Sequence, residues 1–516
     1  MTSRAEEQAA GLRFTGHALI DVGLAAVCAL NKRRRPEEIT LADLDRVSDF
    51  IETNYFSGKL DPYLMVVFTS NSGYAGPNKV TDPADYAEVF RAHRVAPGKH
   101  LDKAGAGQRC VFSEQPASVY VHRQHLPLFA AEGVMNFRPH GQTAVPIAAP
   151  FLTALQFAPM GARRAEGRML LVHSDDAETT LAFARRYLAD AQRLLALALP
   201  VGRADWQPAF EREQPVWDAG KKHYKMADAK GPRSLVVSDL AEISGRAAGD
   251  LRPGPVSLTV YLMSNAGQGP SIDLFEVPSG LVSFIRRAQL PATSEAWKEL
   301  SARFHRVGAA SRGRQPGRAR RKAAAPLVGR AGWSRNPAFE ELYAIFDSGF
   351  TDRAAAQRWL SRHILGRRAR DASAVLDTAG ALPWALAELF LKEVLGMKAA
   401  RIAAIKSFAD KLAVHIHRAH DRKLYRALLF DKLPEVRRAL RSAQRKSVDG
   451  ELLFGLDDYV TVWHHDEGNE FLVRDLVAIR VVERLKELGY FTAHPDDGLP
   501  AEADEEAMST REEVVS

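Results

Sequence analysis

The chain has 516 residues, of which 46% are hydrophobic, a net charge of +7 and two cysteines. This length allows about three domains with buried cores, and two cysteines exclude a disulfide-stapled secreted fold. The longest mostly apolar run, 145–160, has 16 residues and three prolines, which suits a buried core segment and not a membrane span. The N-terminus lacks the pattern of a secretory signal. A cytoplasmic protein without a membrane partner is expected.

The charge is unevenly distributed. Residues 496–516 carry eight acids and one Arg and are expected to form an acidic disordered tail, which leaves +14 on the rest of the chain. Residues 301–335 carry ten Lys or Arg and no acid, in a stretch broken by Gly, Pro and Ala. This stretch is either a solvated flexible linker or a tether that binds nucleic-acid phosphates. Its candidate phosphate-binding residues are Arg318, Arg320, Arg321 and Lys322.

Two helices are predicted near the N-terminus. Apolar residues recur with helical spacing at 14–30, and Thr40 with Asp43 at the third helical position predicts a capping box at the start of the next helix. The segment between the two helices contains four consecutive cations. They either hold backbone phosphate or form a solvated helix end. They are Lys32, Arg33, Arg34 and Arg35.

A polar loop is predicted after the second helix. The run 63–69 is rich in β-formers and predicts a strand, which ends in the turn-forming segment 70–78. Short polar side chains on such a loop can hydrogen-bond to base edges in a groove while a nearby Lys contacts phosphate. The loop is therefore either a plain connection or a reader of a short duplex motif. The candidate contacts are Asn71, Ser72, Asn78 and Lys79.

Strands and helices continue to about residue 300. Apolar and β-branched runs predict strands at 117–122, 169–173, 234–237 and 256–261, with a further strand after the Asn and Gly loop 264–270. A strongly periodic helix is predicted at 178–198. These patterns predict an α+β domain at 1–300.

The composition changes after the basic linker. Residues 336–495 are rich in Ala, Leu and Arg with helical periodicity, which predicts a C-terminal helical bundle. Within it, 397–446 contains fourteen Lys or Arg and four acids. This face is either an ordinary solvated surface or a nucleic-acid-binding one. The predicted fold class is therefore α+β, with a mixed N-terminal α/β region, a basic linker at 301–335 and a helical bundle.

No pattern in the sequence predicts an enzyme. A phosphate-binding Gly-x-x-x-x-Gly-Lys-Ser/Thr loop is absent. Of the three His on a predicted helix, His415 and His417 diverge by about 200° and only His417 and His420 can share a face. A second polar cluster keeps a metal-dependent nuclease open as an alternative. It consists of His464, His465, Asp466 and Glu467.

Several motifs, taken in order, resemble the large subunit of type I CRISPR surveillance complexes (Cascade), in the type I-B group whose members carry two Cys-x-x-Cys pairs. The likeness is spread through most of the chain. The motifs are Thr15-Gly16-His17, Ile20-Asp21-Val22-Gly23, the loop 69–78 with Asn71, Asn136-Phe137, the segment 152–161, Arg474-Asp475-Leu476, Ile479-Arg480 and Glu483.

The sequence departs from this family at the cysteines. The first expected pair is Cys110 and Ser113, and the second falls on Pro146 and Ala149. No four-thiolate site can form, so neither zinc nor another cofactor is expected. Apolar packing is expected to replace the metal as the source of folding energy in this part of the chain. The residues expected to provide it are Phe112, Val145, Ile147 and Phe151.

The resemblance implies a non-catalytic subunit of an RNA-guided DNA-targeting complex in antiviral defence. It would recognise the protospacer-adjacent motif and stabilise the R-loop, while guide pairing reads most of the target. The implied partners are the crRNA, target double-stranded DNA, the backbone and crRNA-end-binding subunits, a small subunit, and a helicase-nuclease or a transposition adaptor.

The resemblance also gives the C-terminal bundle a role. Its basic face would guide the displaced strand, and Met397 would start a separate small subunit by internal initiation. The candidates for the displaced strand are Arg418, Arg422, Lys423, Arg426, Arg437, Arg438 and Arg441. A general nucleic-acid-binding scaffold, unrelated to guided targeting, remains a further alternative.

Overall fold

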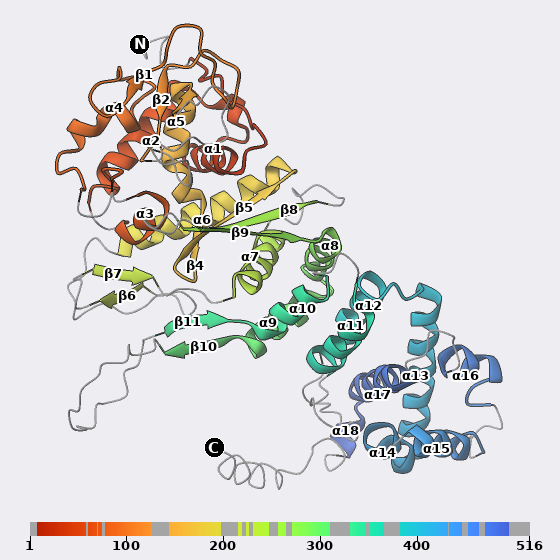
Figure 1. Ribbon diagram of the computed structural model, residues 1–516. Helices are drawn as coiled ribbons and strands as arrows, with labels where there is room; N and C mark the ends of the chain where they lie inside the picture. The colour runs from red at the N-terminus through yellow and green to blue at the C-terminus, as the bar shows by residue number, and fades with distance from the viewer. Residues whose placement is uncertain are drawn as a thin grey trace, which may run out of the picture. The chain divides into compact units, whose positions relative to one another are not determined.

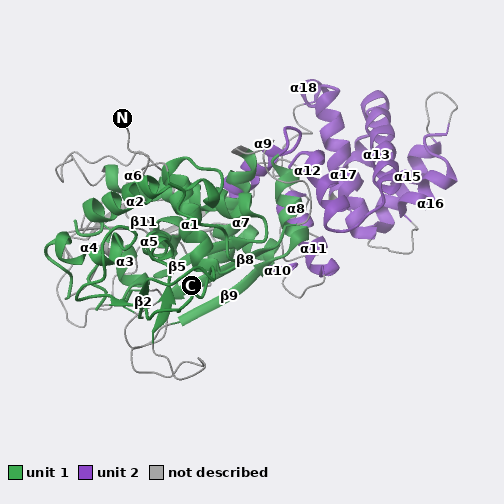
Figure 2. Ribbon diagram, turned by 90° about the horizontal axis from the view of Figure 1, so that it is seen from above, with its two compact units in different colours: residues 1–289, 304–343 green, residues 290–303, 344–516 purple. Residues whose placement is uncertain are grey.

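The computed structural model has a mixed α+β fold, as the sequence predicts (Figure 1). It divides into two compact units, one of residues 1–289 and 304–343 and the other of residues 290–303 and 344–516 (Figure 2). The structure describes residues 8–57, 60–69, 71–74, 78–122, 124–125, 144–197, 215–218, 223–226, 231–246, 256–264, 271–309, 331–346, 351–365, 382–431, 433–445, 452–463 and 470–494.

The first unit contains a four-stranded antiparallel sheet in the order β4-β5-β8-β9. Its strands are β4 Arg163–Ala165, β5 Arg168–Ser174, β8 Leu258–Ser264 and β9 Ser271–Val277. A smaller antiparallel sheet has the order β1-β2-β3, with β1 Asp102–Lys103, β2 Val119–Val121 and β3 Val145–Ile147. Two antiparallel strand pairs complete the sheets, β6 Pro215–Asp218 with β7 His223–Met226 and β10 Arg306–Ala309 with β11 Ala331–Arg335. The predicted strands at 117–122, 169–173 and 256–261 are thus confirmed.

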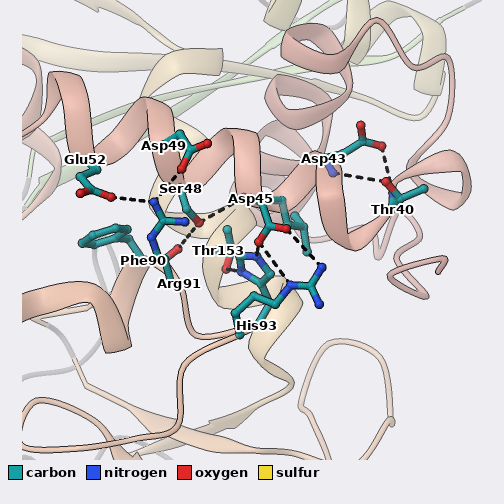
Figure 3. A network of polar contacts seen from close by, with 12 residues as sticks. Thr40, Asp43, Asp45, Ser48, Asp49, Glu52, Phe90, Arg91, His93 and Thr153 are labelled. Atoms are coloured by element: carbon teal, nitrogen blue, oxygen red, sulfur yellow. Dashed lines mark hydrogen bonds and ion pairs between the residues drawn. The ribbon is translucent and has the colours of Figure 1, made fainter. Parts of the chain in front are cut away.

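The first unit also contains α-helices and short 3-10 turns. The α-helices are α1 Ala18–Asn31, α2 Leu41–Asn54, α3 Asp61–Val67, α4 Ala87–Phe90, α5 Ala149–Phe157, α6 Ala177–Leu197, α7 Pro232–Arg246, α8 Ser279–Ala288 and α10 Pro337–Ala344. Short 3-10 turns lie at η1 Pro36–Glu38, η2 Pro83–Tyr86 and η4 Ala158–Gly161. The predicted capping box is confirmed, because Thr40 Oγ1 accepts from Asp43 N at 3.2 Å and Asp43 Oδ2 accepts from Thr40 N at 3.0 Å (Figure 3).

Helix α1 is buried on every side. All positions from Leu19 to Cys28 are buried, and the helix packs against α2, α5, α6 and β5. Two glycines allow its closest approaches. A Cβ on Gly23 would overlap the carbonyl oxygen of Ala154 on α5, and a Cβ on Gly161 would lie 2.8 Å from Val22 O on α1. The backbones of α1 and of the α5–η4 segment therefore touch without intervening side chains.

The predicted strand at 63–69 is wrong, because the chain forms α3 over Asp61–Val67. A proline in the first turn suits a helix start, since its missing N–H is not needed there. Tyr63, Leu64, Val67 and Phe68 are buried whereas Met65 is 56% exposed. This burial repeats at helical and not at alternating positions. The seven-residue apolar run was too short to separate the two periods.

The predicted strand at 234–237 is also wrong, because these residues lie in α7. Val236, Val237, Leu240 and Ile243 are buried, and their spacing is that of one helix face. The β-branched pair dominated the short window that suggested a strand, and the helical period appears only over the full fifteen residues of α7.

The regular elements of the second unit are all helical within its described residues. Its elements are α9 Ser294–Phe304, α11 Arg353–Trp359, the π-helical turn η5 Leu360–Ile364, α12 Trp384–Glu393, α13 Ala399–Ala419, α14 Arg422–Phe430, α15 Leu433–Arg445, α16 Leu456–Trp463, α17 Glu470–Glu487 and α18 Tyr490–Ala493. Helices α13 and α17 pack along each other, and α14, α16 and α18 contact α17. The helical character predicted for the C-terminal part of the chain is confirmed.

Gly23→Ala is expected to lower the melting temperature of the protein, with a loss of about 1 to 3 kcal/mol typical of an overpacked core. The added Cβ has no room against the Ala154 carbonyl, which belongs to a buried helix and cannot move aside. Thermal unfolding followed by far-UV circular dichroism measures the change.

Gly245→Ala is the matched control, because Gly245 also lies in a helix, and its added Cβ would meet its nearest neighbour, Gln289 Oε1, at an ordinary 3.7 Å. The control should be neutral or stabilising by up to about 1 kcal/mol. Equal effects of the two substitutions would contradict the proposed close packing of α1 on α5.

Candidate nucleic-acid interface

The loop between α3 and η2 turns over a buried aromatic ring. Tyr74 is fully buried, and its ring centroid lies 5.3 Å from that of Tyr86. Gly73 adopts a φ of +80°, and Val80 N donates to Gly73 O at 2.9 Å. These two contacts fix the described part of the loop, and Asn71 and Asn78 lie at its surface.

Asn71 and Asn78 form a pair on this loop. Both side chains are exposed, and Asn78 Nδ2 donates to Asn71 Oδ1 at 2.7 Å. In this arrangement the amide NH₂ of Asn71 and the carbonyl oxygen of Asn78 remain available to another molecule. Lys79, the next residue, is half-buried. The fold thus brings together two amides that the sequence analysis singled out. Their outward-facing groups are a donor, the NH₂ of Asn71, beside an acceptor, the carbonyl oxygen of Asn78.

Ser72 does not belong to this exposed set. Its side chain is fully buried, and its hydroxyl oxygen accepts from Tyr74 N at 3.3 Å. The residue therefore stabilises the turn and cannot reach a base edge. A loop sequence alone does not indicate which of its short polar side chains point inward.

The four cations after α1 have different environments. Arg33 Nε donates to Asp43 Oδ2 at 2.9 Å and its NH2 group to Asp43 Oδ1 at 3.3 Å. This bidentate pair raises the pKa of Arg33 and makes the residue part of the α1–α2 connection. Lys32, Arg34 and Arg35 are exposed. The phosphate-binding prediction therefore stays with these three and not with Arg33.

A neighbouring face of the first unit is neutralised internally. Arg91 lies 2.6 Å from both Asp49 and Glu52 of α2, and His93 Nε2 lies 2.9 Å from Asp45 Oδ1 (Figure 3). Burial lowers the pKa of His93 even though Asp45 acts in the opposite direction. Arg91 and His93 thus pair with acids of α2, and this face offers little net charge to a polyanion.

The cations of the C-terminal bundle are mostly exposed. Arg418 lies near the end of α13, and the exposed face of α14 carries three of the candidates. On α15, Arg438 and Arg441 are exposed, whereas Arg437 NH2 donates to Glu470 Oε1 of α17 at 2.5 Å. Arg437 therefore fixes α15 to α17. The other predicted displaced-strand residues are accessible, and those on α14 are Arg422, Lys423 and Arg426.

The predicted linker, 301–335, begins in the last turn of α9 and ends in β11. Residues 306–309 and 331–335 pair antiparallel as β10 and β11. Arg318, Arg320, Arg321 and Lys322 lie outside the described residues. Met397, the predicted internal start, follows Gly396 with its φ of +64° and lies two residues before α13.

The N-terminal motifs have a structural explanation in Asp21. This carboxylate is 3% exposed and accepts from Thr15 N at 2.7 Å and from Gly16 N at 2.9 Å, while His173 Nε2 lies 3.0 Å away. Burial lowers the pKa of His17, which follows in the same turn. The motif at 15–17 is therefore joined to the motif at 20–23, in α1, through the buried Asp21, which also contacts β5.

The segment 152–161 completes the same core. Gln156 is fully buried, its side-chain amide donates to His125 O, and its backbone oxygen accepts from Tyr55 at 2.9 Å. The glycine contacts of this segment with α1 have been described above. Motifs that lie more than a hundred residues apart in sequence thus meet in one packed unit.

The two segments in which the resemblance expects cysteine pairs also lie close together. Val111 N donates to Pro146 O at 3.2 Å, which brings the segment of Cys110 beside that of Ala149. Cys110 is 2% exposed, and Val145, Ile147 and Phe151 are buried nearby in the same core. One thiol with a serine, a proline and an alanine does not supply a zinc ligand set. Apolar packing occupies this place as the sequence predicts.

The C-terminal motif is interior. Asp475 is 2% exposed beside Arg474, and burial raises the pKa of Asp475 to about 6 although Arg474 lowers it. Arg480 binds Asp410 of α13 at 2.7 Å and Glu483 at 2.5 Å. These residues hold α17 in the bundle, so the motif marks a packing element and not a contact surface. Asn136 and Phe137 lie outside the described residues.

Sequence reasoning missed a buried histidine group in the first unit. His125 is fully buried, its Nδ1 accepts from His122 N at 3.2 Å, and the ring of His100 contacts Tyr86 edge-on at 4.9 Å between centroids. Burial, with His122 acting in the same direction, lowers the pKa of His125 to about 4. The three histidines are scattered in sequence without a common period, so no sequence pattern joined them.

The described residues hold no group of three or more His, Cys, Asp or Glu side chains arranged to bind a metal ion. The cluster His464, His465, Asp466 and Glu467 lies outside them, and His417 and His420 point their rings to Tyr490 and His494 respectively. Within the described helices, none is long and apolar enough to cross a bilayer.

Comparison with known proteins finds no matching family model, no matching curated protein and no matching solved structure. Any functional conclusion therefore depends on this chain's own residues and on the resemblance described above.

The first unit is expected to lose stability as the pH falls from 6.5 towards 4. In that range the imidazole of His125 binds a proton in the unfolded chain, where its pKa is ordinary, but not in the folded chain, where burial lowers its pKa. Acid therefore favours the unfolded state, by at most about 3 kcal/mol. Urea unfolding at pH 7, 6, 5 and 4.5 measures this slope.

His125→Asn isolates the contribution of this ring from that of His17 and His93. The variant loses stability at every pH, but its dependence on pH should be flatter than that of the native chain. An unchanged slope would exclude His125 as a source of the acid sensitivity.

Proposed function

We propose that the chain is the non-catalytic large subunit of an RNA-guided type I CRISPR DNA-targeting complex in the cytoplasm. It would recognise a protospacer-adjacent motif, stabilise the R-loop and recruit a helicase-nuclease or a transposition adaptor. Its other partners would be the crRNA, target double-stranded DNA, backbone and crRNA-end-binding subunits and a small subunit. The resemblance in sequence is the origin of this proposal.

The Asn71–Asn78 pair is the observation that carries the recognition role. A base pair presents donors and acceptors side by side along its groove edges. The pair presents the same kind of pattern, an amide donor from Asn71 beside a carbonyl acceptor from Asn78, on an exposed and anchored loop. Pre-arranged side chains of this kind lose less conformational freedom on binding than mobile ones.

The convergence of the motifs supports the assignment of the whole unit. The residues at 20–23 contact both the turn 15–17 and the segment 152–161, and the two segments of the expected cysteine pairs are neighbours. Motifs that matched by chance would have no reason to form one packed centre. They support a shared architecture, while the polar loop and the exposed cations support nucleic-acid binding.

The exposed cations suit the R-loop role. Lys32, Arg34 and Arg35 in the first unit, and several Arg and Lys side chains of α14 and α15 in the second, are exposed. Exposed cations can bind phosphate and release its counterions. A general nucleic-acid-binding scaffold would use the same cations, and it differs in having no need for the asparagine pair. No described residue favours the nuclease alternative.

Asn71→Ala is expected to weaken binding of the assembled guide complex to duplexes that carry the correct flanking motif by about 1 to 3 kcal/mol, the value of one good base contact. Duplexes with a scrambled motif should bind as they do to the native complex. Electrophoretic mobility shift assays with matched duplex pairs measure this difference in specificity.

Lys32→Ala is the control, since a phosphate contact should weaken both duplexes equally and reduce the salt dependence by nearly one unit of slope. If Asn71→Ala also weakens both duplexes equally, the base-reading role of the loop is wrong and the general scaffold is favoured.

A further inference from the structure

A group of aromatic rings lies where α13, α14 and α18 meet. The ring of His494 lies 4.9 Å from that of His420 and 4.8 Å from that of Tyr490, between centroids. Phe491 continues the group, 5.4 Å from Tyr490 and 6.2 Å from Tyr425. Figure 1 shows α18 beside α14 at one end of the bundle. The rings come from segments about seventy residues apart and form one continuous set.

The set has a buried floor and an accessible outer layer. Tyr425 and Tyr490 are 4% and 1% exposed, whereas Phe491 and His494 are half-buried and His420 is exposed. The two buried tyrosines pack inside this part of the bundle. The outer three rings have faces or edges that solvent reaches, which a purely structural cluster does not require.

The backbone conformation at His420 also separates this outer ring from the buried tyrosines. The residue ends α13 in the left-handed conformation, with a φ of +47°. Glycine is the residue that fits this position at a helix end without steric cost, whereas a residue with a Cβ is disfavoured there. The imidazole is thus held at the surface, against His494, by a backbone conformation that favours a different residue.

Exposed cations surround these rings. Arg418 is the penultimate residue of α13, and Arg422, whose backbone N–H donates to His420 O at 2.8 Å, begins α14. Arg426 follows one turn later, on the same side of α14 as Arg422. Asp421, between these arginines in sequence, caps α14, because its carboxylate accepts from Leu424 N at 3.0 Å.

We propose that His420, Phe491 and His494 form a base-stacking platform for single-stranded nucleic acid, with the arginines of α13 and α14 binding the adjoining phosphates. Rings beside a cationic track are the combination that single strands recognise, because every base has a π-face and the backbone supplies the charge. A duplex keeps its bases stacked inside and cannot use the rings. The inference depends on the proposed strand-guiding role of the bundle and assigns it a specific site.

The test compares a 20-nucleotide oligo-dT with an oligomer of the same length whose central nucleotides are abasic, both fluorescently labelled and bound to the full chain. His420→Asn with Phe491→Leu removes two rings while keeping a residue that tolerates the left-handed backbone and a side chain of similar volume. Affinity for oligo-dT should fall about tenfold, within the range for lost base stacking. Affinity for the abasic oligomer should change less than twofold.

Phe471→Leu is the matched control, because Phe471 is another exposed aromatic of the bundle, 49% accessible at the start of α17. It should leave both affinities unchanged. An equal fall of the ring variant on both oligomers, or no fall on either, overturns the platform.

Arg422→Ala with Arg426→Ala separates this inference from the proposed function. This variant should weaken both oligomers alike. If it does so while the ring variant has no effect, the strand-guiding role stands and the platform is wrong. If neither variant weakens binding, the strand-guiding role of this face is wrong as well.

Photocrosslinking gives a second measurement that needs no variant. An oligomer carrying 5-iodouracil is irradiated with the native chain, and the crosslinked peptides are identified by mass spectrometry. Crosslinks to the peptide that contains Phe491 and His494 are expected, and crosslinks found exclusively elsewhere would overturn the proposal.

Discussion

The first unit depends on the direct contact of α1 with the α5–η4 segment. Ten consecutive buried positions on α1 require neighbours on every side, and Gly23 and Gly161 remove the Cβ atoms that would keep the backbones apart. The buried carboxylate of Asp21 fixes the entry to the helix and ties it to β5 through His173. With α1 in place, α2 and the polar loop that follows α3 are positioned at the surface, and acids of α2 are paired within the unit.

The sequence predicted those parts of the fold in which a local rule and the tertiary contact agree. Thr40 and Asp43 form the expected capping box because the motif contains both of its partners. Helix α6 and strand β5 were predicted correctly because α6 has a long helical hydrophobic period and β5 is a clear apolar run. The segments 63–69 and 234–237 were mistaken for strands because short runs of Val and Leu suit either structure. Only the burial pattern over a full helix separates the two.

The candidate site was predictable in composition but not in accessibility. Sequence identified the 71–79 loop and the cationic runs, yet it could not show that Ser72 is buried, that Arg33 is bound by Asp43 or that Arg437 is bound by Glu470. These outcomes depend on residues that are distant in the chain. The ring group at His420 and His494 was missed for the same reason, because its members share no sequence period.

The most direct test of the central claim is co-purification of the tagged chain, expressed with its neighbouring genes, followed by sizing and extraction of bound RNA. The account predicts recovery in a complex with a repeated backbone subunit and a guide RNA of uniform length. A second product of about 120 residues would mark initiation at Met397. A lone chain that carries only nucleic acid of mixed length, with no repeated subunit, would contradict the account and favour a general nucleic-acid-binding scaffold.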